Sequence, residues 1–281
     1  MGFDRLAVIS SPPMPESTNS PAARDQGSDY FARQADRYSR HRPLYPDELF
    51  SQLAGLCQAH ELAWDVGTGS GQAAGGVARH FERVLATDAS EEQIAHAHPH
   101  ANVTYRRAPA HSSGLDEGSV DLVTVATALH WFDLDAFYAE VRRVLRPAGV
   151  IAVWGYQDTS VTPAVNEVLV RYRTEVVGED WAFQVRLLTD QYRTVPFPFE
   201  EVTAPTHLFA RADMALDDVM GYLESWSATQ RHRERTGRDP LDLIRSDLAT
   251  AWGDPATVRT VQWPLFMRIG RNSTGPRARG Y

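Results

Sequence analysis

A glycine-rich turn between a buried strand and a helix is the feature of this sequence that most constrains its fold. Residues 64–72 read WDVGTGSGQ, and the next apolar run, VLATD, ends at Asp88. Glycines at alternate positions let the backbone turn sharply and approach a ligand where a Cβ atom would collide. An acid at the end of the second strand, about 20 residues after the glycines, is placed to accept hydrogen bonds from both hydroxyls of a ribose. This order predicts an α/β domain that binds a nucleoside.

The spacing of the glycines argues against a dinucleotide. A dinucleotide fingerprint has the spacing G-x-G-x-x-G and holds a pyrophosphate, whereas Gly67, Gly69 and Gly71 have the spacing G-x-G-x-G. Asp65 at the tip of the first strand would repel a pyrophosphate. Its carboxylate could instead accept a hydrogen bond from a ligand's ammonium group or hold the turn in shape. An aminoacyl nucleoside without phosphate fits better than NAD, and a tight turn without a ligand remains an alternative.

Short apolar runs alternate with helical segments up to Tyr156, which predicts a parallel sheet with crossover helices. The expected strands are 62–66, 83–87, 103–106, 120–126 and 150–154. The expected helices are 47–60, 71–81, 90–98 and 134–146. Right-handed crossovers place the carboxyl ends of all these strands at one edge, where the ligand is expected.

Beyond Tyr156 this alternation stops. Helices are expected at 163–177, 215–227 and 240–252, and strands at 203–210 and 258–269. The mixed-charge run from Arg231 to Arg235 is followed by Gly237, which favours an exposed turn over a phosphate site. The segment that is rich in Arg, Gly and Pro from Arg271 onward predicts a flexible tail.

Composition narrows the classes of partner. The net charge of −8 argues against a surface that follows nucleic-acid phosphates. No apolar stretch reaches the ~18 residues of a membrane span, and the single cysteine, Cys57, suits a reducing cytoplasm. His96, His98 and His100 are interrupted by Pro99, so no metal site is predicted.

These motifs resemble a known family. The run Asp65–Gly71 together with Asp88 resembles the first two motifs of class I S-adenosylmethionine (SAM)-dependent methyltransferases. The resemblance extends to three further runs: YSRHRPLYP at 38–46, DLVTVATALHWF at 121–132 and VRRVLRPAG at 141–149. Together they are similar to the methyltransferase type 11 subgroup, which includes trans-aconitate methyltransferase-like enzymes.

This resemblance implies a Rossmann-like, doubly wound α/β fold with a seven-stranded mixed sheet, a C-terminal antiparallel strand pair and helical lid elements. It implies a SAM-dependent enzyme that methylates a small molecule, at a carboxylate or hydroxyl oxygen. The alternatives are a nicotinamide-dependent oxidoreductase and a non-catalytic SAM-binding module. A monomer and a homodimer both remain open. The expected organisation is a disordered leader (1–28), a SAM-binding core (29–156), a C-terminal half that forms the acceptor pocket (157–270) and a flexible tail (271–281).

The resemblance also assigns roles in cofactor binding. It implies that the backbone of the turn, Gly67, Thr68, Gly69 and Gly71, cradles the amino-acid portion of SAM. It implies that Asp88 binds the ribose hydroxyls.

Four further positions carry cofactor roles by resemblance. Ala89 would lie beside the adenine, and His111 stands where many relatives carry an acid near the adenine amino group. Tyr38 and Arg42 belong to a segment that closes over the cofactor, and a guanidinium matches a carboxylate of SAM or of the acceptor.

The loop after the strand 120–126 occupies the edge where acceptors meet the methyl group. It carries Thr127, His130 and Trp131, and Thr127 and Trp131 are expected to bind the cofactor. His130 is either a catalytic base or a wall of the cofactor pocket, since a histidine titrates near neutral pH. Trp131 offers a flat, electron-rich face that favours a sulfonium.

Overall fold

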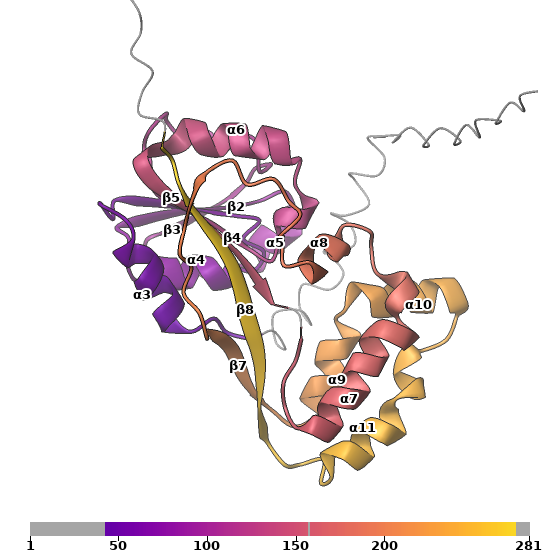
Figure 1. Ribbon diagram of the computed structural model, residues 1–281. Helices are drawn as coiled ribbons and strands as arrows, with labels where there is room; N and C mark the ends of the chain where they lie inside the picture. The colour runs from indigo at the N-terminus through magenta and orange to yellow at the C-terminus, as the bar shows by residue number, and fades with distance from the viewer. Residues whose placement is uncertain (1–42, 157, 274–281) are drawn as a thin grey trace, which may run out of the picture.

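An eight-stranded sheet forms the centre of the computed structural model, which describes residues 43–156 and 158–273 (Figure 1). Its strands run in the order β3-β2-β1-β4-β5-β8-β6, and β7 pairs with β8 outside this path. The parallel strands are β1 (Leu62–Val66), β2 (Arg83–Asp88), β3 (Val103–Arg107), β4 (Val120–Ala126) and β5 (Leu145–Tyr156). The order reverses at β1, which lies between β2 and β4. Open α/β sheets bind ligands at such a switch point, and the predicted α/β Rossmann-like fold is confirmed.

Helices cover both faces of the parallel strands. They are α3 (Asp47–Gly55), α4 (Gln72–Val77), α5 (Glu91–Ala95) and α6 (Leu134–Val144). Side chains alternate along a strand, so each strand contributes to two cores. Ala63 and Leu122 pack with α3 and α4 on one face, whereas Trp64 and Val123 pack with α6 on the other. This double burial explains why the central strands are apolar throughout.

The strand β8 (Arg259–Arg271) corresponds to the expected strand 258–269. The sheet has eight strands rather than the expected seven because two strands replace the expected strand 203–210, and both pair with β8. The strand β8 is thirteen residues long and pairs antiparallel with several partners. Its second half pairs with β5 and with β6 (Glu200–Val202), inside the main sheet. Its first half pairs with β7 (Phe209–Met214), away from the parallel strands. In Figure 1, β8 is the long yellow strand that leads from the sheet to the helices at the lower right.

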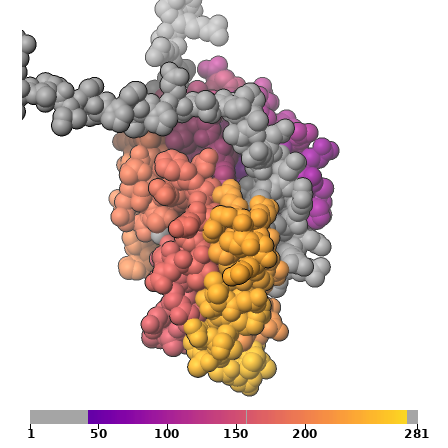
Figure 2. All heavy atoms as spheres, turned by 90° about the vertical axis from the view of Figure 1, so that its right-hand side faces the viewer, coloured from indigo at the N-terminus to yellow at the C-terminus, as the bar shows by residue number. Residues whose placement is uncertain are grey.

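The helices of the C-terminal half form a cap with its own apolar core. They are α7 (Pro163–Arg171), a π-helical turn (Tyr172–Val176), α9 (Leu216–Glu224), α10 (Ser227–Thr236) and α11 (Arg245–Trp252). The short helix α8 (Val185–Thr189) lies outside this core and packs through Leu187 and Leu188 on the face of the sheet that α6 covers. Tyr222, Trp252 and Trp263 are buried in the cap core, and Trp263 belongs to β8. The segments that carry α7 and α11 are in contact and occupy the lower part of the face shown in Figure 2.

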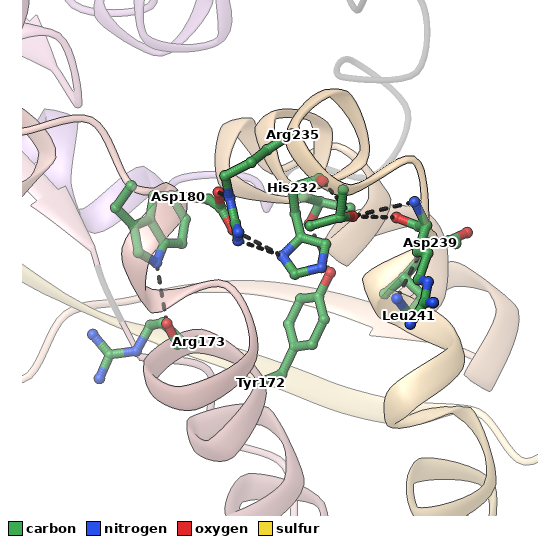
Figure 3. A network of polar contacts seen from close by, with 11 residues as sticks. Tyr172, Arg173, Asp180, His232, Arg235, Asp239 and Leu241 are labelled. Carbon is green, nitrogen blue, oxygen red and sulfur yellow. Dashed lines mark hydrogen bonds and ion pairs between the residues drawn. The ribbon is translucent and has the colours of Figure 1, made fainter.

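The run from Arg231 to Arg235 is helical, so the predicted exposed turn is wrong. It lies in α10, and two of its side chains bind the buried carboxylate of Asp180 (Figure 3). His232 Nδ1 lies 2.8 Å from Asp180 Oδ2, and Arg235 Nε donates to Oδ1 across 2.7 Å. Residues three apart share one face of a helix, and here that face meets a buried acid.

Some predicted boundaries are corrected as well. The expected strand 203–210 is replaced by β6 and β7, with a connecting segment between them. The helices α3, α4 and α5 end earlier than predicted, at Gly55, Val77 and Ala95. The expected flexible tail begins too early, because Arg271 pairs in β8 and the side chain of Asn272 donates to the Leu145 carbonyl across 3.1 Å. The leader 1–28 and residues 274–281 lie outside the described residues.

Candidate functional site

The glycine turn connects β1 to α4 and adopts a conformation that L-residues rarely adopt. Gly67, Gly69 and Gly71 have φ values of 66°, 54° and 85°, in the left-handed region that glycine reaches without steric cost. A Cβ atom at Gly67 would lie 2.7 Å from Ala128 Cβ, and one at Gly71 would lie 2.9 Å from the Tyr105 ring.

Gly69 differs from the other two glycines, because the protein leaves more room around it. Of the atoms in residues 43–156 and 158–273, only Gln93 Oε1 would lie within 4 Å of a Cβ atom there, at 3.7 Å. The backbone at Gly69 is therefore the part of the turn that a ligand can approach most closely, as the nucleoside prediction requires.

Asp88 ends β2 and binds the turn. Its carboxylate accepts hydrogen bonds from the backbone N–H groups of Gly69 and Ser90, both across 2.9 Å. Burial raises the pKa of Asp88, and these N–H groups oppose that rise. A carboxylate has about four acceptor sites, so two backbone donors leave capacity for two ribose hydroxyls. Ala89, the next residue, is exposed.

Asp65, at the tip of β1, holds the loop and the neighbouring strand together. Its two oxygens accept hydrogen bonds from Thr68 Oγ1 at 2.6 Å and Thr124 Oγ1 at 2.7 Å. The side chain is 1% exposed, and burial raises its pKa to about 6. Of the two roles predicted from the sequence, the structure supports the shaping of the turn. A ligand's ammonium group would further favour the ionised carboxylate.

The loop after β4 lies next to this turn and carries the predicted edge residues. Thr127 has a φ of 56°, and its hydroxyl lies 3.3 Å from the hydroxyl of Tyr45. Its backbone N–H donates to the Trp154 carbonyl across 2.8 Å, which anchors the loop to β5. Trp131 is 38% exposed, with its ring centroid 4.9 Å from that of His130.

His130 is buried in the short 3₁₀ helix Leu129–Trp131 and is bound to a residue that the sequence analysis did not single out. Its Nδ1 lies 2.8 Å from the hydroxyl of Tyr192. Burial lowers the pKa of His130 to about 4, so the imidazole is neutral at pH 7. Tyr192 lies 62 residues further along the chain, and no local pattern in the sequence marks it.

The remaining predicted site residues are not brought to the turn by the part of the chain that the structure describes. His111 is exposed, and none of the hydrogen bonds described here links its side chain to the turn. Tyr38 and Arg42 lie outside the described residues. Burial raises the pKa of Cys57 to about 12, which keeps its thiol protonated.

SAM fits the residues present. The open backbone at Gly69 suits a closely approaching ligand, and the acceptor capacity of Asp88 suits a ribose. Within the described ranges, no group of three or more His, Cys, Asp and Glu side chains is placed to hold a metal ion. The described helices include none that is long and apolar enough to cross a membrane.

Comparisons with known proteins agree with this geometry. Residues 64–153 match the type 11 family model whose description is "Methyltransferase domain". A Dictyostelium discoideum protein that carries the name methyltransferase is 34% identical over 86% of this chain and 95% of its own length. An uncharacterized methyltransferase of Mycobacterium tuberculosis is 32% identical over 78% of this chain and 86% of its own length.

A solved structure supports the same assignment. A chain from Anaeromyxobacter dehalogenans that is described as a type II methyltransferase superposes with a TM-score of 0.78 and is 45% identical. The match covers 82% of this chain and 98% of that one. The nicotinamide-dependent alternative is not favoured by these relatives.

Proposed function

Because this chain belongs to the SAM-dependent methyltransferases, we propose that it transfers the methyl group of SAM to an oxygen atom of a small molecule, and that this oxygen belongs to a carboxylate. The observation that carries the proposal is the environment of His130, which is 7% exposed and whose Nδ1 lies 2.8 Å from the Tyr192 hydroxyl. With a pKa of about 4, its imidazole is a weak base at pH 7. An acceptor that is already ionised needs no base, so a carboxylate fits this site better than a hydroxyl.

Different residues would bind the cofactor and orient the acceptor in this reaction. The backbone around Gly69 and the carboxylate of Asp88 would hold the amino-acid portion and the ribose of SAM. Thr127 and Trp131 lie on the loop after β4, where they would orient the acceptor beside the methyl group. Alignment of two reactants and exclusion of water account for much of the rate enhancement that such a site can provide.

The chemical step balances without a proton acceptor. SAM, when bound, supplies a methyl group on a positively charged sulfur. One oxygen of the acceptor carboxylate forms the new O–C bond while the S–C bond breaks, and the electron pair of that bond stays on sulfur. The products are a neutral methyl ester and a neutral thioether, so the negative and positive charges cancel and no proton leaves the acceptor.

We assign the acceptor pocket to the C-terminal half of the chain. Residues 29–156 would bind the cofactor, and residues 157–270 would form the acceptor pocket as well as the cap. The acceptor is a small molecule, because the net charge of −8 opposes nucleic acid. We also propose that the chain belongs to the trans-aconitate methyltransferase-like subgroup and acts in the cytoplasm.

Transfer of labelled methyl from SAM to a panel of small carboxylic acids, phenols and amines tests the function. We expect label in one or more carboxylic acids, and Asp88→Ala should reduce SAM affinity and transfer together. Label only in amines would contradict the choice of acceptor atom. SAM binding without transfer to any member of a broad panel would favour the non-catalytic binding module.

A further inference from the structure

Tyr192, which follows α8, and His130, on the loop after β4, form a buried pair beside the sheet. The Tyr192 hydroxyl and His130 Nδ1 are 2.8 Å apart, and their rings are stacked with centroids 6.1 Å apart. The side chain of Tyr192 is 0% exposed and that of His130 is 7% exposed. A hydrogen bond between two groups that are both removed from water fixes the position of the proton that it contains.

The direction of this hydrogen bond follows from the needs of the hydroxyl proton. Among the described residues, His130 Nδ1 is the one hydrogen-bond acceptor within reach of the Tyr192 hydroxyl. If Nδ1 carried a proton and donated, the hydroxyl proton would be buried without an acceptor, which is unfavourable. Burial also raises the pKa of Tyr192, while the backbone N–H groups of His130 and Leu129 act in the opposite direction by donating toward its oxygen. Tyr192 therefore donates and Nδ1 accepts.

The backbone around Tyr192 is held in an unusual conformation. Gln191 and Tyr192 have φ values of 54° and 56°, which are costly for residues with side chains. Arg268 of β8 donates through Nη1 to the Tyr192 carbonyl across 2.9 Å, and its Nη2 lies 2.6 Å from Glu201 Oε1. An ion-paired arginine of the main sheet thus fixes the turn that delivers the Tyr192 hydroxyl.

From this geometry we propose that Tyr192 is a positioning residue, which holds His130 as the neutral tautomer with its proton on Nε2 and so makes His130 a hydrogen-bond donor to the acceptor carboxylate. A neutral imidazole with Nδ1 as acceptor carries its single proton on Nε2. Among the described residues, Nε2 of His130 makes no hydrogen bond. The part of this inference that concerns the acceptor rests on the proposed function. The tautomer does not.

The tautomer can be measured directly on the full-length protein by NMR. Histidine is labelled with ¹⁵N, and the spectrum of His130→Gln identifies the signals of His130 among the ten histidines. At pH 7 we expect Nε2 to carry the proton and Nδ1 to give the shift of a hydrogen-bonded, unprotonated nitrogen. A proton on Nδ1 in the wild-type protein would overturn the proposal, and this result requires no variant of Tyr192.

Tyr192→Phe tests the cause of the tautomer. It removes only the hydroxyl, so Nδ1 should lose its hydrogen-bonded shift and Nδ1–H should become populated. Tyr138→Phe is the matched control, because the Tyr138 hydroxyl is buried in the same apolar cluster as Tyr192 but has no hydrogen-bond partner among the residues that the structure describes. It should leave the His130 signals unchanged. Equal spectra for wild type and Tyr192→Phe would overturn the role of Tyr192.

Kinetics with an acceptor from the panel then test whether His130 donates a hydrogen bond to the acceptor carboxylate. Tyr192→Phe should lower kcat about tenfold, the usual scale for one misplaced hydrogen bond, with the Kd for SAM unchanged. The wild-type kcat should be flat from pH 7 to pH 9, above the range in which Asp65 titrates, whereas a rise with a pKa between 7 and 9 would show a base and contradict the donor role. If no acceptor is methylated, the proposed function fails while the NMR result still decides the tautomer.

Discussion

The backbone N–H of Gly69 donates a hydrogen bond to the carboxylate of Asp88 across 2.9 Å. This contact joins the turn after β1 to the tip of β2, so the two features that the sequence presents separately form one unit. The side chain that is expected to bind the ribose also fixes the backbone that is expected to hold the amino-acid portion of SAM. A change at either residue should therefore affect the whole cofactor.

Replacement of Asp88 should weaken SAM binding. Asp88→Ala removes the acceptor for the ribose hydroxyls and for the Gly69 N–H, and we expect a loss of roughly 1–3 kcal/mol in binding free energy, the usual cost of unpaired hydrogen-bonding groups. Titration calorimetry measures the change. Glu91→Ala is the control, since Glu91 is exposed and its contact is with Arg107. An unchanged Kd in Asp88→Ala would exclude Asp88 as the ribose ligand.

Two glycines of the same segment should respond in opposite ways to alanine. Gly71→Ala combines a φ of 85° with a Cβ atom 2.9 Å from the Tyr105 ring, and should lower the free energy of unfolding by about 1–2 kcal/mol or more. Gly75→Ala lies in α4 with nothing within 4 Å of the new Cβ, and should raise it by up to about 1 kcal/mol. Urea denaturation compares the two. Equal effects would contradict the described geometry of the turn.

The raised pKa of Asp65 predicts a specific pH dependence of stability. Its ordinary value of 3.8 rises to about 6 in the folded protein, so between these values the folded state binds more protons than the unfolded state. The free energy of unfolding should therefore fall as the pH rises through about 6, by roughly 3 kcal/mol for this group alone.

Asp65→Asn isolates this contribution because it removes the titrating group. The free energy of unfolding of the wild type minus that of the variant should decrease from pH 4 to pH 7, as measured by denaturant titrations at several pH values. A difference that does not change over this range would show that Asp65 is ionised throughout, with an ordinary pKa.

The carboxylate of Asp180 should stabilise the cap. Asp180→Ala leaves His232 and Arg235 without their buried acceptor, and we expect a loss of roughly 1–3 kcal/mol of stability together with faster proteolysis within α10. Asp247→Ala is the control, because the ion pair of Asp247 with Arg171 is exposed and such pairs contribute little. Similar effects of the two substitutions would contradict a special role for Asp180.

The cofactor half was predictable because its information is local. The turn, the strands on either side and the acids Asp65 and Asp88 lie within residues 62–88, and each is required by backbone geometry or by a single contact. The apolar runs that mark β1 and β4 follow from burial on both faces. The sequence thus predicted the fold and the edge of the sheet at which Asp65 and Asp88 lie.

The cap and the His130 contact depend on residues far apart in the sequence, which explains what was missed. Tyr192 contacts His130 through a turn with positive φ values, and no residue type in that segment predicts such a turn. The mixed signs of the charges from Arg231 to Arg235 and the following Gly237 predict an exposed turn, but this run is part of α10. The three-residue spacing of His232 and Arg235 is that of one helical face. The acid that they bind, Asp180, lies more than 50 residues earlier.

The central claim, transfer of the SAM methyl group to a carboxylate, is tested most directly by the stability of the labelled product to alkali. The enzyme is incubated with SAM labelled in its methyl group and with the panel of small molecules, and the product is then treated with mild base. A methyl ester releases its label as volatile methanol, whereas a methyl ether or a methylamine retains it. We predict volatile label that is lost in Asp88→Ala, and label that stays bound after alkali would contradict the account.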